Sequence, residues 1–234
     1  MTSKVVTLPG LLTALLSLSG CAHEYSARPM EAFVVDADTG DPIEGVNVVA
    51  SWKIEGGFEG GNNLGRLMVL EALSDKQGRF RIAGWGPKKL PDGGKIHADQ
   101  PEVVFFKAGY KYNRVQNYKG SLVAEAPPIM DFDYNGQKIK FEKFKGTLPE
   151  YFEHLNGTLE ADLVTTFLHG DTPCVWKNVP MLLSALARQS AAFESADIGV
   201  HSGSPFYKQL LASESAMIQN GCGSVGEFLR EHAQ

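Results

Sequence analysis

Short segments of alternating apolar and polar residues, separated by turn residues, constrain the fold of this chain more than any other feature. The clearest pair lies in "EAFVVDADTGDPIEGVNVVASW", where residues 38–42 form a turn signal because Gly40 tolerates positive φ and Pro42 presets its own φ. In the second segment of the pair, one face is expected to carry Val46, Val48, Ala50 and Trp52, and the other Asn47, Ser51 and Lys53. A strand, a turn and a second strand are therefore predicted.

Further segments of the same kind follow. "LMVLEALSDKQGRFRIAGW" reads as a strand pair around the turn at residues 75–78, and "EVVFFKAGYKYNRV" and "GQKIKFEKF" supply more strands. Several short strands with regular turn signals are typical of a β-sandwich, which is expected over residues 30–145.

Three motifs in this part resemble the carboxypeptidase regulatory-like family. They are Thr39-Gly40-x-Pro42-Ile43-x-Gly45-Val46, Asp75-x-x-Gly78-x-Phe80 and Lys107-Ala108-Gly109-Tyr110. The resemblance implies a transthyretin-like, seven-stranded Greek-key sandwich that acts as an accessory module and has no shared catalytic residues. The peptidase that named the family binds zinc through His-x-x-Glu, and none of the six histidines here has Glu three residues later.

The periodicity becomes helical in residues 146–234. "LPEYFEHLNGTLEADLVTTFL" has helical spacing interrupted at Asn156-Gly157, and "NVPMLLSALARQSAAFE" places its large apolar residues on one side. A third helix is expected from the N-cap Ser204 to a stop at Asn220-Gly221, and a fourth after a capping box from Ser224 to Glu227. The predicted fold is thus mainly β with α: a sandwich followed by a helical extension. Its apolar stripes pack against each other or the sandwich, or form a groove for a partner.

The first twenty residues have the pattern of a signal peptide. The apolar run "VVTLPGLLTALLSL" follows Lys4 and is too short to span a bilayer comfortably. The tetrapeptide Leu18-Ser19-Gly20-Cys21 resembles the bacterial lipobox, which implies cleavage before Cys21, lipidation of its thiol and a tether over 21–29. Ala22 after the cysteine favours the outer membrane, with the protein facing the periplasm. The alternatives are an ordinary secretory leader or a buried N-terminal helix.

Two cysteines remain once Cys21 is assigned to lipid. An oxidising periplasm permits Cys174 and Cys222 to form a disulfide, which would hold the ends of the helical part together. Two buried free thiols or a metal pair are the alternatives, although no His/Cys spacing supports a zinc site.

Two glycine-rich loops, at residues 55–65 and 84–101, are longer than hairpins need. One interpretation is a ligand-binding rim that carries Phe58, Trp85 and His97. The other is tolerated loop length, with Trp85 packed against the sandwich.

Other candidate motifs are weak. Gly221 to Gly226 matches G-x-G-x-x-G but follows a predicted helix, whereas a dinucleotide site needs a preceding strand. Asp131 and Asp133 would bind a cation or, more simply, serve as turn residues. Neither His169 nor His201 lies in a catalytic motif.

Composition completes the functional expectation. The chain has 22 Lys and Arg against 27 Asp and Glu, a net charge of −5, and no basic patch, so nucleic acid is not expected as a partner. Transthyretin-like sandwiches include intradiol dioxygenases with two Tyr and two His on iron, but no local cluster of that kind is present. We expect a non-catalytic binding or scaffolding protein with no cofactor or metal and with an envelope protein as partner. A subunit of an envelope secretion machine, or an enzyme or ligand binder using the two loops, is the alternative.

Overall fold

The computed structural model describes residues 24–56, 62–119, 124–160, 163, 174–198 and 210–232. Strands occupy the first part of the chain: β1 Glu24–Ala27, β2 Met30–Asp36, β3 Asn47–Gly56, β4 Asn62–Leu73, β5 Arg79–Ile82, β6 Trp85–Lys89, β7 Glu102–Phe106, β8 Asn113–Gln116, β9 Ile129–Met130 and β10 Lys138–Phe141. Helical elements follow: α1 Leu148–Leu155, the π-helical turn η1 Asn156–Glu160, the 3-10 turn η2 Val175–Asn178, α3 Pro180–Ser195, α5 Glu214–Gln219 and α6 Val225–His232.

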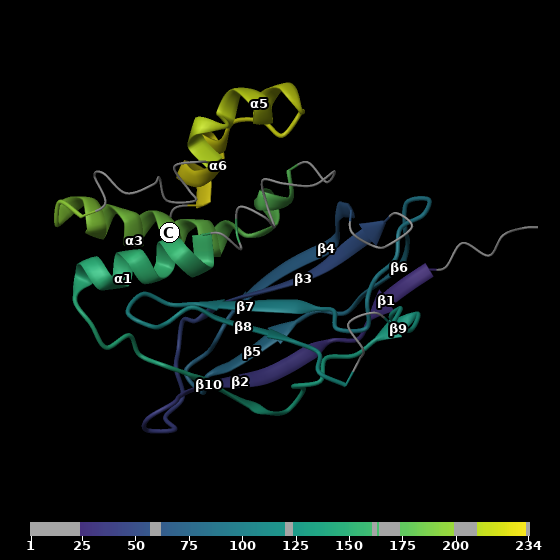
Figure 1. Ribbon diagram of the computed structural model, residues 1–234, viewed down its shortest axis with the longest axis horizontal. Coiled ribbons are helices and arrows are strands. Elements are labelled where there is room, and N and C mark those ends of the chain that lie inside the picture. Colours follow the sequence, from purple (N-terminus) through teal and green to yellow (C-terminus); the bar gives the residue numbers. More distant parts are fainter. Residues whose placement is uncertain are drawn as a thin grey trace, which may run out of the picture.

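The strands form three sheets, in the orders β6-β1-β9, β10-β2-β5 and β4-β3-β7-β8. The third sheet is antiparallel, with β3 between β4 and β7, and the two smaller sheets face it (Figure 1). The architecture is therefore a β-sandwich with helices after it, as the sequence predicts. The described residues contain ten strands, more than the seven implied by the family resemblance.

The space between the sheets holds the first of two apolar cores, which we call the inner core. The predicted apolar face is confirmed: Val48, Ala50 and Trp52 of β3 and Val46 just before it are all fully buried there. They pack with residues from the facing sheets, among them Val34, Phe80 and Phe141. Because side chains alternate along the strands, the residues on one face of each sheet point into the inner core.

The turn motifs have the geometry that their residue types require. At the β4–β5 turn, Asp75 Oδ1 accepts hydrogen bonds from the amides of Gln77 (2.9 Å) and Arg79 (3.0 Å). Gly78 has φ +72°, and a Cβ added there would lie 2.4 Å from the carbonyl oxygen of Val34. Only glycine suits this position, because the turn passes directly against β2.

Helices cover the opposite face of the β4-β3-β7-β8 sheet (Figure 1). The second core, here called the outer core, lies between them. From the sheet come Val49, Val69, Val104 and Phe106, and from the helices come residues that include Phe152, Trp176, Leu183 and Phe193. The face of β3 predicted as polar is consequently buried as well, with Asn47 6% and Ser51 3% exposed.

The predicted helix ends are confirmed at 220–221 and 224–227, whereas the helix predicted up to Asn220 is interrupted at Ser213, and α5 begins at Glu214. Leu159 remains buried beyond Asn156-Gly157 because the chain continues as η1 rather than breaking. The stop at Asn220-Gly221 ends α5, with Gly221 at φ +76°. The amide of Glu227 donates to Ser224 Oγ (3.1 Å), as expected for the start of α6. Ser204 lies outside the described residues.

The disulfide between Cys174 and Cys222 is present, with an S–S distance of 2.10 Å. It joins the residue before η2 to the connection between α5 and α6. Beside it, Trp176 meets Phe228 edge-on at a centroid distance of 5.0 Å. Covalent and aromatic contacts together hold α6 against the outer core.

The N-terminal segment differs from the tether predicted for residues 21–29. Residues 24–27 form β1, which pairs with β6 and β9, and Tyr25 is 1% exposed. The segment is structural because Tyr25 and Ala27 belong to the inner core. The predicted leader over 1–20 and Cys21 lie outside the described residues. Within the described part of the chain, no helix has the length and apolar character needed to cross a membrane.

Candidate functional site

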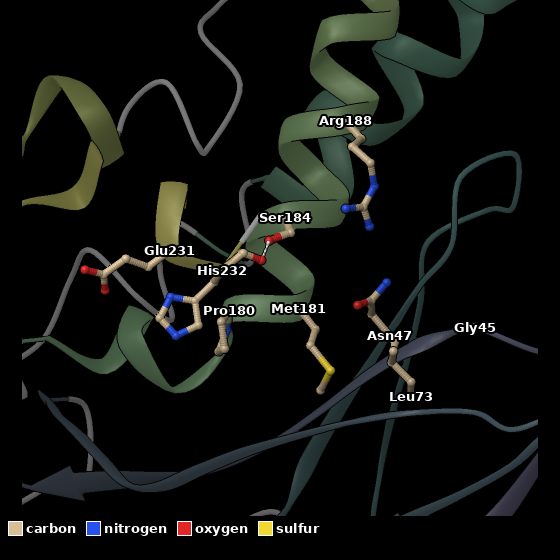
Figure 2. Close-up of a pocket in the computed structure, with 9 residues that line it drawn as sticks. All are labelled: Gly45, Asn47, Leu73, Pro180, Met181, Ser184, Arg188, Glu231 and His232. Carbon is tan, nitrogen blue, oxygen red and sulfur yellow. Dashed lines mark hydrogen bonds between the residues drawn. The ribbon is translucent and has the colours of Figure 1, made fainter. Parts of the chain in front are cut away.

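A hollow of about 500 Å³ opens where the ends of the large sheet meet α3 and α6 (Figure 2). The turn before β3 contributes Gly45, the sheet contributes Asn47 and Leu73, and the helices contribute Pro180, Met181, Ser184, Arg188, Glu231 and His232. A second hollow of about 300 Å³ shares Gly45, Asn47 and Arg188 with it and continues along α3 past Lys107 and Ala192. We call the two together the rim groove. Their combined size is suitable for a small ligand.

The sheet side of the rim groove is formed by the ends of three strands. Asn47 begins β3, Leu73 ends β4, and Phe106 ends β7 and is followed by residues 107–108. The side-chain amide of Asn47 donates to the carbonyl of Phe106 (3.4 Å), which fixes its position. Leu73, by contrast, is 46% exposed although it is a large apolar residue at the edge of a well-packed sheet. The sheet therefore presents both a fixed polar group and open apolar surface.

The helix side depends on a contact from the sheet. The carboxylate of Glu71 on β4 accepts hydrogen bonds from the amides of Met181 (2.8 Å) and Leu182 (3.1 Å) in the first turn of α3. Val179 at the N-cap offers no side-chain cap, so Glu71 takes that role from a distant part of the chain. Burial raises the pKa of the Glu71 carboxyl, and the two amide hydrogen bonds act in the opposite direction.

The C-terminal end of α6 forms the remaining wall. The hydroxyl of Ser184 on α3 donates to the carbonyl of His232 (2.8 Å). The ring of His232 stacks on Phe228 at 4.1 Å, and its Nδ1 lies 2.8 Å from the carbonyl of that residue. The wall is thus attached to α3 by a hydrogen bond and to the outer core through Phe228.

Charges are distributed unevenly along the rim groove. Arg188 lies where the two hollows meet, and Lys107 lines the second, where its ammonium donates to the carbonyl of Glu44 (2.9 Å). Glu231 is at the far end, and Figure 2 shows its carboxylate directed away from Arg188. The guanidinium of Arg188 points toward the sheet side, above Asn47. One end of the first hollow is therefore cationic and the middle is apolar.

The residues predicted for a loop-based site lie elsewhere. Trp85 packs edge-on against the buried Trp52 at 5.1 Å and contacts the inner core. His97 is 17% exposed, with its Nε2 3.4 Å from Glu55 Oε2. Since Glu55 is near the end of β3 and Asn47 at its start, these residues are at the opposite end of the strand from the rim groove. Phe58 lies outside the described residues.

The two predicted loops are also shorter than expected. The β3–β4 hairpin continues to the pair Gly56 and Asn62, so the predicted loop over 55–65 is partly strand. The predicted loop over 84–101 contains β6, which pairs with β1. Strand pairing, within the β3–β4 hairpin for the first segment and with the distant β1 for the second, thus accounts for part of the length of each predicted loop.

The remaining candidates have structural roles. Asp133 Oδ2 accepts hydrogen bonds from the amides of Tyr118 and Lys119, both at 2.8 Å, and Asp131 pairs with Arg28 at 3.5 Å. The G-x-G-x-x-G motif follows helix α5 and opens the short α6, as its sequence context indicates. Across the described ranges, no group of three or more His, Cys, Asp or Glu side chains is placed to hold a metal ion. His169 and His201 lie outside those ranges.

Sequence reasoning did not find the rim groove. Its lining comes from four separate stretches near residues 45, 73, 107 and 180–192, together with the end of α6. The helical extension was expected to have an apolar face, but no local pattern indicated which strand ends it would meet. The role of Glu71 as a helix cap is not visible in the sequence either, because the amides that it binds are 110 and 111 residues away.

Comparison with known proteins gives remote structural likenesses. No family model and no curated protein matches the chain. A 3-chlorocatechol 1,2-dioxygenase from Rhodococcus opacus 1CP is 16% identical, with a TM-score of 0.32 over 51% of this chain and 61% of that one. A 9R-lipoxygenase from Cyanothece PCC8801 is 10% identical (TM-score 0.25, 91% of this chain and 32% of that one). A 5-hydroxyisourate hydrolase from Klebsiella pneumoniae is 20% identical (TM-score 0.19, 51% and 99%). At these TM-scores the likenesses carry no functional argument.

Proposed function

We propose that this protein is a non-catalytic binding module of the bacterial cell envelope and that the rim groove is its binding site. The observation that carries the proposal is the hollow of about 500 Å³ between strand ends and helices, with open apolar surface at Leu73 beside fixed polar groups. Ligand sites in proteins are concave, largely apolar and equipped with a few well-placed polar groups. The helical part thus has a role beyond covering the sheet: it builds one wall of the site.

The sandwich is proposed to be a carboxypeptidase regulatory-like domain with a transthyretin-like fold. The three motifs that carry the resemblance support this, since Gly40, Gly45, Gly78 and Gly109 all have positive φ at the turns in question. Such a domain would act as the rigid support on which the rim groove is assembled.

Photocrosslinking tests the proposed site. A photoreactive amino acid replaces Leu73 in the groove, and the matched control replaces Leu148, an exposed leucine (40%) that does not line it. In cells, we expect a discrete adduct at position 73 that is absent at position 148 and is lost when Met181→Trp fills the groove. Equal labelling at positions 73 and 148, or an adduct that survives Met181→Trp, would contradict the proposal.

We further propose that Cys21 carries lipid and holds the module at the membrane, most simply the outer membrane with the groove facing the periplasm. Two or more acyl chains anchor a protein stably, at about 0.8 kcal/mol for each buried methylene. Cys21→Ala should abolish palmitate labelling and leave an unprocessed or released product, whereas Ser17→Ala should behave as wild type. Continued lipid-dependent membrane binding of the Cys21→Ala protein would exclude this anchor.

A further inference from the structure

We propose that the end of the sandwich formed by β1, β6 and β9 rests on the surface of a phospholipid bilayer. The contact surface, here called the anchor face, consists of Lys88, Lys89, Pro127, Pro128 and Ile129. This inference rests on the proposed lipid at Cys21 and adds the orientation of the protein on the membrane.

The chain between the proposed lipid and the fold is short. Glu24 begins β1, so only two residues separate it from Cys21. Three residue steps of fully extended chain span at most about 11 Å. The start of β1 is fixed in the fold, because Tyr25 is 1% exposed and belongs to the inner core. A bilayer that holds the lipid of Cys21 would therefore meet the fold beside the start of β1.

Strand pairing places the anchor face next to this point. Lys88 and Lys89 on β6 pair with the first two residues of β1. On the other side of β1, Ser26 pairs with Ile129 of β9, and its amide donates to the carbonyl of Pro128 (2.8 Å). Figure 1 shows β1, β6 and β9 together at one end of the sandwich. The anchor face thus surrounds the position at which the chain would leave the membrane.

The part of the anchor face beside β9 is apolar and open to solvent. Pro127, Pro128 and Ile129 are consecutive and exposed, and Ile129 is 53% exposed. Ala126 and Met130 on either side of this run are buried in the inner core, which fixes its position. Contact with the headgroup region of a bilayer would remove this apolar surface from water.

The charges of the anchor face are compatible with lipid phosphates. Lys88 and Lys89 are exposed, and their long side chains can reach phosphate groups while their stems lie along apolar surface. The acids within two residues of the anchor face, or paired with it, all have partners: Glu24 with Lys89 (3.9 Å), Asp131 with Arg28 (3.5 Å) and Glu125 with the hydroxyl of Tyr25. None of these three acids is left to oppose the approach of an anionic headgroup.

The anchor face and the rim groove lie toward opposite ends of β3. Trp85, which begins β6, packs against Trp52 in the second half of β3, whereas Asn47 at its start lines the groove. A strand of ten residues is about 30 Å long. Figure 1 also shows α1 and α3 away from β1, β6 and β9. In the proposed orientation the rim groove is therefore held away from the bilayer.

Fluorescence quenching by lipids tests this orientation. The lipidated protein is reconstituted into vesicles of phosphatidylcholine and phosphatidylglycerol that contain a phospholipid with a nitroxide on its headgroup. A fluorescent amino acid replaces Ile129 in one protein and Ile218 in the other. The two positions are matched, because both isoleucines are 53% exposed and Ile218 lies on α5. We expect the nitroxide to reduce emission at position 129 at least about twofold and to leave position 218 nearly unchanged.

A second experiment tests the apolar part of the anchor face. The fluorescent amino acid replaces Lys89, and Ile129→Asp introduces a charge that resists contact with the headgroup region. Quenching at position 89 should fall by at least about half, because the charged face is held less closely to the bilayer. Ile218→Asp is the matched control and should leave quenching at position 89 unchanged. Circular dichroism confirms that each variant is folded.

Equal quenching at positions 129 and 218 would overturn the inference, as would unchanged quenching at position 89 in Ile129→Asp. No quenching at position 129 of lipidated, vesicle-bound protein would also overturn it and leave the exposed run for a protein partner. Palmitate labelling separates these failures from failure of the anchor. Protein that carries no lipid and does not bind vesicles would remove the proposed role of Cys21 and this inference with it, whereas the crosslinking test at position 73 depends on neither.

Discussion

The two faces of the β4-β3-β7-β8 sheet carry cores that are assembled in different ways. On the inner face, Val48, Ala50 and Trp52 pack against other strands. On the outer face, Val49 and Val104 pack against helices that begin more than forty residues after β7. The inner core is made by strand alternation alone, whereas the outer core requires separate elements to be brought to the sheet and held there.

Three contacts hold the outer layer in place: Glu71 at the start of α3, the disulfide between Cys174 and Cys222, and Ser184 against the carbonyl of His232. Ser184 lines the rim groove, and Glu71 adjoins it through its hydrogen bond to the amide of Met181. Damage to the outer core should therefore affect binding before it affects the sandwich, and damage to the inner core should affect both.

Trp52→Ala is expected to have the largest effect. The side chain is fully buried between the sheets and contacts Trp85, so its removal leaves a large cavity that costs about 3–5 kcal/mol of unfolding free energy. Urea unfolding measures the loss, and amide exchange should accelerate in both cores. The partly exposed Trp85 provides the comparison, because Trp85→Ala should cost less. Exchange that accelerates only in the helices would contradict the view that the inner core supports the outer one.

Removing the disulfide should produce the next largest effect and confine it to the outer core. Cys174→Ser with Cys222→Ser frees a connection between residues 48 apart in sequence, worth about 4 kcal/mol on the chain-entropy model. Amides of α6 should lose protection against exchange while those of β2 and β5 keep it. Reduction of the wild-type protein should reproduce this pattern, and a sandwich that unfolds together with α6 would show that the two cores form one cooperative unit.

The difference between the cores also explains which parts of the fold can be predicted from the sequence. Val46, Val48, Ala50 and Trp52 share a face because side chains alternate along a strand, and this local rule is sufficient to define the inner core. Turn residues such as Asp75 and Gly78 act on their immediate neighbours, so their positions are also predictable. The disulfide is predictable because only two cysteines remained to pair.

The outer core and the rim groove depend on contacts that local patterns do not contain. Asn47 is polar and is predicted on the face of β3 opposite Val48 and Trp52, and local alternation does not show that helices cover this face and bury it. The segment 24–27 has too little context to reveal that it pairs with β6 and β9. Glu71 has no feature that marks it as a cap, since a capping residue normally lies next to its helix. Pairings across a hundred residues are visible only in the folded molecule.

Glu71→Ala tests the contact between sheet and helix directly. Loss of the hydrogen bonds to the amides of Met181 and Leu182 should cost about 1 kcal/mol, the usual value for an N-cap. Glu71→Gln retains a carbonyl acceptor and should cost less. The midpoint of urea unfolding gives the loss, and faster exchange of the amides at the start of α3 gives its location. Unchanged exchange there in Glu71→Ala would mean that the helix is held by packing alone.

The smallest expected effect is a pH dependence at another contact between the two layers. His154 Nε2 on α1 accepts a hydrogen bond from the amide of Tyr112 (3.1 Å), which requires a neutral ring. Burial lowers the pKa of His154 below its usual 6.5, and the nearby Lys111 lowers it further.

Because the unfolded chain takes up this proton at a higher pH than the folded protein, the contribution of His154 is fully present above about pH 6.5. It is lost as the pH falls toward the lowered pKa. His154→Gln supplies a non-titrating acceptor and should show a smaller loss of urea stability between pH 7.5 and 5.5 than the wild type. Equal losses would mean that this edge of the outer core does not depend on the charge of His154, and that packing of its ring against Phe144, which in turn packs against Tyr151, is sufficient.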